Sequence, residues 1–403
     1  MKLLLIPESN SLSHVTKCLA VRESLLCRGH EVILAVSSSN SPFLKQNSIP
    51  HEVISDIQER DGAGLPTVEW FRRTDDIVKT IRDEVDLLER CGPDRVLGVF
   101  RFTARASAKL AGIPYDSLIC GCMLPESKDA LGFADGEEGS VFQKAILDGF
   151  YRYGAAKLNV ALKFFGLDRI DDMRSMLHGE RTFLWDFPEF FSFPNDAGVT
   201  HVGPVSWNRW PYDDADMGPV EETSRPVAIV SFGTCMKDIA ITERIMGLLN
   251  KMGYFVVLAA GGQKDVLNAV LPSSSVMTCK LAPIDKLLPL ASLVVTHGGQ
   301  LTIFEALHHQ VPVAVIPFQP EQAHNGVCLE RIGCGVRLVP SAPFQGNSRV
   351  YTDRFKEMTD DAIMRKIRDL TENSETAKNM AAIKSVLDTY KGAEAIADVM
   401  EAG

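Results

Sequence analysis

The residues from Thr296 to Glu305 place a histidine, two glycines and a hydroxyl between an apolar segment and a helical one. The apolar residues Leu293–Val295 predict a buried strand. Gly298 and Gly299 come at the strand-to-helix turn, where the backbone must approach something closely. The helix that follows begins with free amides and the positive end of its dipole. The pattern therefore predicts an anion site, and a phosphate suits it best.

Three side chains near this turn have matching chemistry. His297 stands at the strand end, ready to donate to a diphosphate oxygen, and Thr302 adds a hydroxyl. Glu305 follows three residues later on the same helix face and can accept hydrogen bonds from a ribose. The alternative is a packing turn with a capping threonine. That alternative fits the whole set poorly, because Glu321 and Gln322 follow downstream.

A second candidate, His14, lies between the short apolar run Leu3–Ile6 and a helical pattern. A neutral imidazole on this loop can take a proton from a hydroxyl group. The alternative is a surface or helix-capping histidine. Alone, His14 would favour that alternative, but with the predicted phosphate site elsewhere in the chain we favour catalysis.

The elements that must position these residues occur twice. Each half opens with a strand, a loop, a helix, a glycine and a second strand. The segments are Leu3–Ile6, Gly29 and Val32–Val36 in the first half, and Val227–Ser231, the helix 240–251, Gly253 and Phe255–Leu258 in the second. Gly29 and Gly253 are predicted helix C-caps.

This repetition predicts an α/β protein of two Rossmann-like, doubly wound domains, residues 1–215 and 216–403. The Pro-, Trp- and Asp-rich stretch 203–226 reads as the linker, and the segment of about 375–400 as an amphipathic helix that can pack on either domain. Parallel sheets bind ligands at the carboxyl ends of their strands. We therefore expect the ligand in a cleft that both domains face.

Composition excludes several classes. The 403 residues carry 42 Lys and Arg against 52 Asp and Glu, a net charge of −10, which argues against non-specific nucleic-acid binding. No apolar run reaches the roughly 18–20 residues that span a bilayer. The nine scattered cysteines never form a CxxC pair, as is typical of reduced thiols, and predict a cytoplasmic protein.

The C-terminal half carries a specific set of motifs, Ala282-Pro283, Leu288-Pro289, Thr296-His297-Gly298-Gly299, Thr302, Glu305-Ala306-Leu307, Val311-Pro312, Pro317, Glu321-Gln322 and Asn325. With them the chain resembles the inverting, nucleotide-sugar-dependent glycosyltransferases of the two-domain GT-B fold. Within these it is most similar to the UDP-glycosyltransferase group that acts on small molecules.

The resemblance implies roles for these residues. His297, Gly298, Gly299 and Thr302 would hold the diphosphate, Glu305 the ribose, and Glu321 and Gln322 the sugar hydroxyls. Ser231, Gly233 and Thr234 match the family's loop after the first C-terminal strand, which also faces the phosphates.

In the N-terminal half the resemblance rests on Ser13-His14-Val15, Leu19-Ala20 and Arg28–Val32. His14 falls where the family places its catalytic histidine. Many relatives orient that histidine with an aspartate, but here Val99 stands at about that position. His14 therefore either lacks the partner or uses another carboxylate. Ile284 and Leu301 also depart from residues common in the family.

These observations predict an inverting glycosyltransferase that moves a sugar from a UDP- or dTDP-sugar to a hydroxyl of a small, apolar acceptor, with His14 as general base. The nucleotide sugar is a co-substrate, and no other cofactor is expected. The resemblance also implies that no metal is needed, because in that family helix amides neutralise the leaving diphosphate. Asp214-Ala215-Asp216 reads as a solvated acidic loop. The alternatives are a sugar-nucleotide epimerase and a non-catalytic sugar-nucleotide-binding protein. Sugar, acceptor and oligomeric state stay open.

Two further segments bear on the acceptor. The loops of about 55–80 and 120–150 are expected to build its pocket. The aromatic run Trp185, Phe187, Phe190, Phe191 and Phe193 could line the same pocket, but core packing is the favoured interpretation.

Overall fold

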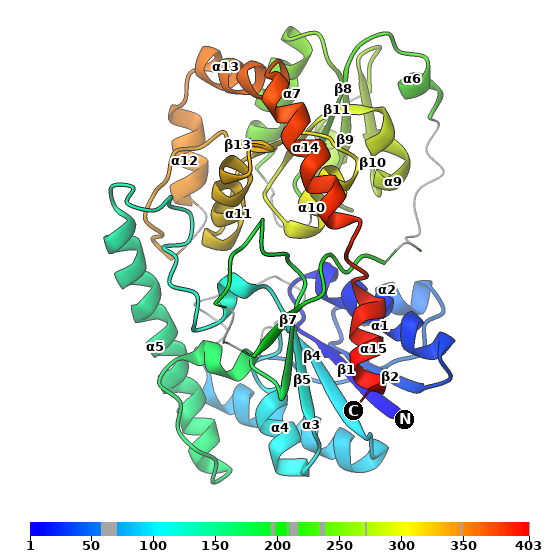
Figure 1. The fold of residues 1–403 in the computed structure, drawn as a ribbon, viewed down its shortest axis with the longest axis vertical. Helices are drawn as coiled ribbons and strands as arrows, with labels where there is room; N and C mark the ends of the chain where they lie inside the picture. The colour runs from blue at the N-terminus through cyan, green and yellow to red at the C-terminus, as the bar shows by residue number, and fades with distance from the viewer. Residues whose placement is uncertain are drawn as a thin grey trace. The chain divides into compact units, whose positions relative to one another are not determined.

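The computed structural model describes residues 1–57, 71–194, 198–207, 209, 217–233, 238–270, 272–346 and 349–402 (Figure 1). The chain forms two compact units. Unit 1 comprises Met1–Lys128, Ala145–Asn208 and Tyr390–Gly403, and unit 2 comprises Asp129–Lys144 and Arg209–Thr389.

Unit 1 is built on a parallel sheet of seven strands in the order β3-β2-β1-β4-β5-β6-β7. The strands are β1 (Lys2–Pro7), β2 (Glu31–Val36), β3 (Glu52–Val53), β4 (Arg95–Val99), β5 (Tyr115–Ile119), β6 (Arg181–Leu184) and β7 (Val199–His201). Leu3–Ile6 are fully buried, as expected of a strand covered on both faces.

The helices of unit 1 include α1 (Leu12–Cys27), α2 (Ser41–Gln46), α3 (Thr74–Cys91), α4 (Ala104–Ala111) and α15 (Ala393–Glu401). The long helix α5 (Ser140–Phe164) begins in residues of unit 2 and continues in unit 1. Short 3-10 helices span Gly121–Met123 and Met173–Leu177.

Unit 2 has a parallel sheet of six strands in the order β10-β9-β8-β11-β12-β13. The strands are β8 (Val227–Ser231), β9 (Phe255–Ala259), β10 (Val276–Cys279), β11 (Ala291–Thr296), β12 (Val313–Val315) and β13 (Gly335–Arg337). The helices include α6 (Gly218–Glu221), α7 (Ile239–Lys251), α8 (Lys264–Ala269), α9 (Ile284–Leu287), a 3-10 turn (Leu288–Leu290), α10 (Gln300–His308), α11 (Pro320–Arg331), α12 (Arg349–Glu357), α13 (Asp360–Thr371) and α14 (Ser374–Leu387).

The prediction of two doubly wound parallel sheets is confirmed. Gly29 and Gly253 have φ of 81° and 90°, so they end α1 and α7 in the left-handed conformation that glycine tolerates best. In both sheets the strand order reverses at one place, between β1 and β4 in unit 1 and between β8 and β11 in unit 2. Such switch points are where open α/β sheets bind ligands.

The chain passes between the units more often than the expected boundary at residue 215 implied. Residues 129–144 belong to unit 2, where the buried Gln143 donates to the Leu131 carbonyl (2.8 Å) and accepts from the Phe344 amide (2.8 Å). Part of the expected linker, residues 208 and 210–216 with Asp214-Ala215-Asp216, lies outside the described residues. So does much of the expected acceptor loop 55–80.

The prediction of one helix over residues 375–400 was wrong. The segment forms α14 in unit 2 and α15 in unit 1, separated at Gly392 with φ of 54°. The Gly392 amide donates to the Val202 carbonyl (2.9 Å), and a side chain there would strike the Pro204 carbonyl oxygen. The sequence pattern alone did not reveal the turn.

Candidate functional site

At the switch point of unit 2, the loops after β8 and β11 leave the sheet side by side. Thr296 and Ser231, the last residues of these strands, are paired in the sheet register. A Cβ on Gly233 would lie 3.1 Å from the His297 ring, and one on Gly299 only 2.7 Å from it. The imidazole of His297 therefore lies against two glycines, and neither position has room for a larger residue.

Burial lowers the pKa of His297 from 6.5 to about 4, although a hydrogen bond to the Ser231 backbone acts in the opposite direction. The ring is therefore neutral at physiological pH. A neutral imidazole beside helix amides can donate a hydrogen bond to an anionic oxygen but brings no full positive charge.

Helix α10 begins directly after the turn formed by Gly298 and Gly299. Gly299 is the N-cap, and a glycine has no side chain with which to cap the first amides of the helix. Gly298 has φ of 94°, and a Cβ there would lie 2.6 Å from the Gln322 carbonyl oxygen of α11. The glycine thus lets the turn pass directly beside the start of the next helix.

Helix α11 connects the predicted sugar-binding residues to this turn. The side-chain amide of Asn325 donates to the Gly298 carbonyl (2.8 Å) and to the Glu321 carboxylate (2.7 Å). The Gln322 side-chain oxygen accepts from the Phe318 amide (3.0 Å). The structure therefore brings Glu321 and Gln322 beside the turn that carries His297, with Asn325 as the bridge. No role for Asn325 was expected beyond the motif match.

The remaining predicted donor residues lie on the same elements. Thr302 and Glu305 are half-buried on α10, and Ser231 and Gly233 lie at the end of β8 and in its loop. Thr234 lies outside the described residues. The loop after β9 contacts the same edge of the sheet. The side-chain amide of Gln263 in that loop donates to the Gly233 carbonyl (2.7 Å).

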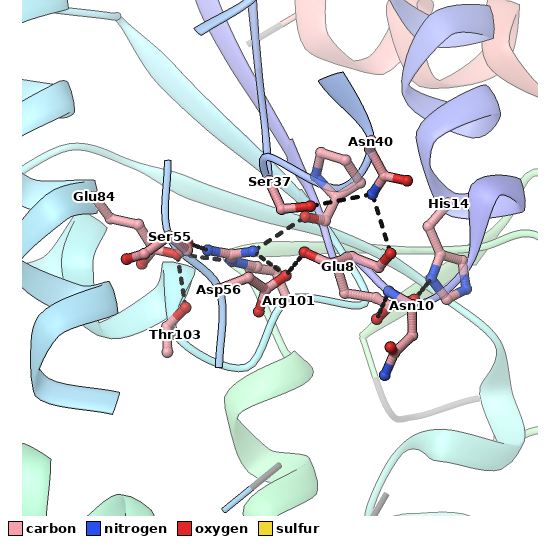
Figure 2. Close-up of polar contacts among 12 residues, drawn as sticks. Glu8, Asn10, His14, Ser37, Asn40, Ser55, Asp56, Glu84, Arg101 and Thr103 are labelled. Atoms are coloured by element: carbon pink, nitrogen blue, oxygen red, sulfur yellow. Dashed lines mark hydrogen bonds and ion pairs between the residues drawn. The ribbon is translucent and has the colours of Figure 1, made fainter. Parts of the chain in front are cut away.

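At the switch point of unit 1, His14 lies in the first turn of α1 (Figure 2). Its Nδ1 is 2.6 Å from a carboxylate oxygen of Glu8, and the two side chains are 13% and 2% exposed. The Phe100 ring stacks on the imidazole at 5.1 Å with an interplanar angle of 10°, and the Trp185 ring lies 5.6 Å away. The ring is thus held by one carboxylate and two aromatic residues.

The carboxylate partner comes from the loop after β1. Val99, which was expected at about the position of the family's aspartate, is a fully buried residue at the end of β4. Sequence reasoning left the partner of His14 open. The available signal was an acidic residue directly after the first strand, six positions before the histidine.

The aromatic run 185–193 is buried, with its five aromatic side chains no more than 6% exposed. Among the described residues, no cluster of three or more His, Cys, Asp or Glu side chains could hold a metal ion. In the same part of the chain, no helix has both the length and the apolar character to cross a membrane.

Comparison with known proteins agrees with this geometry. Residues 245–341 match the glycosyltransferase family 28 C-terminal domain. A PGL/p-HBAD biosynthesis rhamnosyltransferase of Mycobacterium bovis (strain BCG / Pasteur 1173P2) is 25% identical over 350 residues, which cover 84% of this chain and 76% of that protein.

Two solved structures share the fold over nearly the whole chain. The glycotransferase of kitacinnamycin has a TM-score of 0.75 at 19% identity, covering 99% of this chain and 98% of that one. A glycosyltransferase of Streptomyces sp. SF2575, complexed with thymidine diphosphate, has a TM-score of 0.66 at 20% identity and covers 100% of both chains. These solved structures show the GT-B fold, and together with the matched family 28 C-terminal domain and the mycobacterial relative they confirm the predictions of the fold and of a glycosyltransferase.

Proposed function

We propose that the protein transfers a sugar, with inversion, from a dTDP- or UDP-sugar to a hydroxyl group of a small apolar acceptor. The observation that carries the proposal is the half-buried His14, whose Nδ1 lies 2.6 Å from a carboxylate oxygen of Glu8. With Nδ1 engaged in this contact, Nε2 is the nitrogen that would take a proton. An imidazole held in this way is suited to general-base catalysis.

The donor half of the proposal rests on the glycine turns of unit 2. The first amides of α10 and the neutral His297 would hold the diphosphate, together with Gly298, Gly299, Thr302 and the loop Ser231, Gly233 and Thr234. Glu305 would bind the ribose, and Glu321 and Gln322 the sugar hydroxyls. Hydrogen-bond donors held in fixed positions stabilise the charge that develops on a leaving group. The thymidine diphosphate in a structural relative makes dTDP-sugars the first donors to test.

The reaction then proceeds in one displacement. The acceptor hydroxyl gives its proton to Nε2 of His14 while its oxygen forms a bond to C1 of the sugar. The bond from C1 to the phosphate oxygen breaks on the opposite side, and its electron pair leaves with the nucleotide diphosphate. Attack opposite the leaving group inverts the anomeric centre.

An apolar acceptor is supported by what surrounds His14. The rings of Phe100 and Trp185 contact the imidazole, so a hydroxyl group that reaches Nε2 does so beside aromatic carbon. Aromatic side chains are the usual lining of sites for small molecules.

The test is a reaction panel of dTDP- and UDP-sugars with hydroxylated apolar acceptors, in which NMR determines the anomeric configuration of each product. We expect a glycoside of inverted configuration. Retained configuration would contradict the mechanism. A new sugar isomer formed from donor alone would favour an epimerase, and tight donor binding without product on any acceptor would favour a non-catalytic binding protein.

A further inference from the structure

Both carboxylate oxygens of Glu8 accept hydrogen bonds. Oε2 accepts from the Asn10 amide (2.8 Å), and Oε1 accepts from the Ser11 amide (2.9 Å). Oε1 also lies 2.6 Å from Nδ1 of His14. Backbone amides can only donate, so Glu8 acts as an acceptor on both sides and Nδ1 is assigned the hydrogen of the shared bond.

The loop that carries Glu8 is anchored on both sides of it (Figure 2). Arg101, 1% exposed, donates to the Pro7 carbonyl (3.3 Å) and forms an ion pair with Asp56 (2.5 Å). The Ser9 hydroxyl donates to the same Asp56. The residues before and after Glu8 are therefore held by one buried ionic cluster, and the carboxylate cannot easily turn away from His14.

That cluster is itself fixed to helix α3 and to the residue before Asp56. The Arg101 guanidinium pairs with Glu84 of α3 (2.7 Å) and donates to the Ser55 carbonyl (2.8 Å). Glu84 also accepts from Thr103 (2.7 Å). A buried ion pair is costly to break when one partner is removed, so this support is rigid.

The loop after β4 explains why the carboxylate that contacts His14 comes from the loop after β1. Phe100, directly after β4, has φ of 55° and stacks its ring on the imidazole. The Glu8 amide donates to the Val99 carbonyl (3.0 Å), so the loops after β1 and β4 leave the sheet side by side. An aromatic ring thus occupies the β4 side of His14, and the acid approaches from the β1 side.

We propose that Glu8 is the positioning residue of the general base. It holds His14 with the hydrogen on Nδ1, so that Nε2 accepts the proton of the acceptor hydroxyl, and its negative charge stabilises the imidazolium that forms. Glu8 itself takes no proton, as is established for carboxylates in this arrangement. The inference rests on the proposed function, because it requires His14 to be the base.

The first test is Glu8→Gln, assayed with donor and acceptor at saturation. Glutamine has one acceptor oxygen and one amide donor, so at least one N–H group that now faces an oxygen would face a donor instead. We expect kcat to fall by about 10²- to 10⁴-fold, with donor affinity unchanged. Glu8→Asp keeps the charge and should recover part of the rate. Glu23→Gln alters a carboxylate of α1, the helix that carries His14, which accepts from Trp207 (2.9 Å), and this variant should keep the wild-type rate.

The second test introduces Glu8→Gln into His14→Ala. If Glu8 acts through His14, the double variant is no slower than His14→Ala alone. The inference would be overturned if Glu8→Gln lowered the rate of His14→Ala by the same factor as it lowers the wild-type rate. A wild-type rate for Glu8→Gln alone would also overturn it. A wild-type rate for His14→Ala would instead overturn the proposed function itself.

A third measurement determines the tautomer of His14 in the unaltered protein, and a variant serves only to assign the signal. In ¹⁵N-histidine NMR, the signal lost in His14→Ala identifies this residue. We expect the chemical shifts of a ring protonated at Nδ1. A ring protonated at Nε2 would overturn the inference.

Discussion

His297 is a neutral histidine in the proposed phosphate site. Because burial lowers its pKa to about 4, it stays uncharged from about pH 5.5 to pH 8. We therefore expect the ratio of donor Kd values for His297→Asn and wild type to stay constant over this range in calorimetric titrations with a sugar nucleotide. A ratio that grows as the pH falls would show that the imidazole binds as a cation.

His324 affects stability in the same unit. Burial, and then the charges of Arg331 and Arg337, lower its pKa from 6.5 to about 3. The Asp129 carboxylate lies 3.6 Å from its Nε2. Below about pH 6.5 the unfolded chain therefore binds a proton at this histidine that the native state does not bind. The contribution of His324 to the free energy of unfolding is fully present above that pH and is lost as the pH falls towards about 3.

The prediction is that thermal unfolding monitored from pH 7 to pH 4 shows a smaller decrease in Tm for His324→Gln than for wild type. His308→Gln, which replaces an exposed histidine of α10, is the matched control and should keep the wild-type slope. Equal slopes for all three proteins would contradict the account.

At this scale the sequence predicted a set of candidate donor residues, and the described ones lie on neighbouring elements of unit 2. That they bind the donor stays a prediction. These residues are close to a strand end in the sequence, so a single turn is enough to bring them together. The partner of His14 was not predictable in the same way. Choosing among Glu8, Asp56 and Glu84 requires the side-chain directions around Arg101, which depend on packing between distant segments.

Among the elements, the turn between β11 and α10 determines the donor site most directly. Gly298→Ala forces a side chain into a backbone conformation with φ of 94° and against the Gln322 carbonyl at 2.6 Å. We expect a loss of stability and a donor affinity at least about tenfold weaker, since tenfold corresponds to only 1.4 kcal/mol.

Gly253→Ala is the matched control in the same unit. Its φ is 90°, and a Cβ there meets nothing within 4 Å. It should cost about 1 kcal/mol of stability for the left-handed conformation but leave donor affinity unchanged in calorimetry. Equal effects of both substitutions on affinity would show that the turn has no special relation to the ligand.

The strands were the most predictable elements. Val227–Ser231 was predicted with its observed bounds, because a buried parallel strand is a short apolar run between breakers. The break at Gly392 was missed, since only contacts with Val202 and Pro204 show why the chain turns there.

At the scale of the whole molecule, the chain returns to unit 1 for its last helix. Ile396, Ala397 and Met400 of α15 are fully buried there, and Arg28 of α1's C-cap pairs with Asp398 (2.7 Å). Helix α1 also carries His14, so we expect the packing of α15 against α1 to help hold the proposed base in place. The sequence did not indicate to which half the segment belongs.

We predict that a chain ending at Thr389 loses thermal stability in unit 1 and loses transfer activity, while calorimetry still detects donor binding by unit 2. A chain ending at Met400 keeps the three apolar residues and loses only exposed contacts, including that of Glu401 with His30 (2.9 Å). It should behave like wild type, because exposed ion pairs contribute little. Full activity of the chain ending at Thr389 would contradict this role of α15.

The central claim is that His14 removes the acceptor proton in a site whose donor is held independently of it. The most direct measurement is the transfer rate of His14→Ala with donor and acceptor at saturation, beside its donor Kd. We predict a rate about 10²- to 10⁴-fold below wild type with unchanged donor affinity. A wild-type rate would contradict the claim.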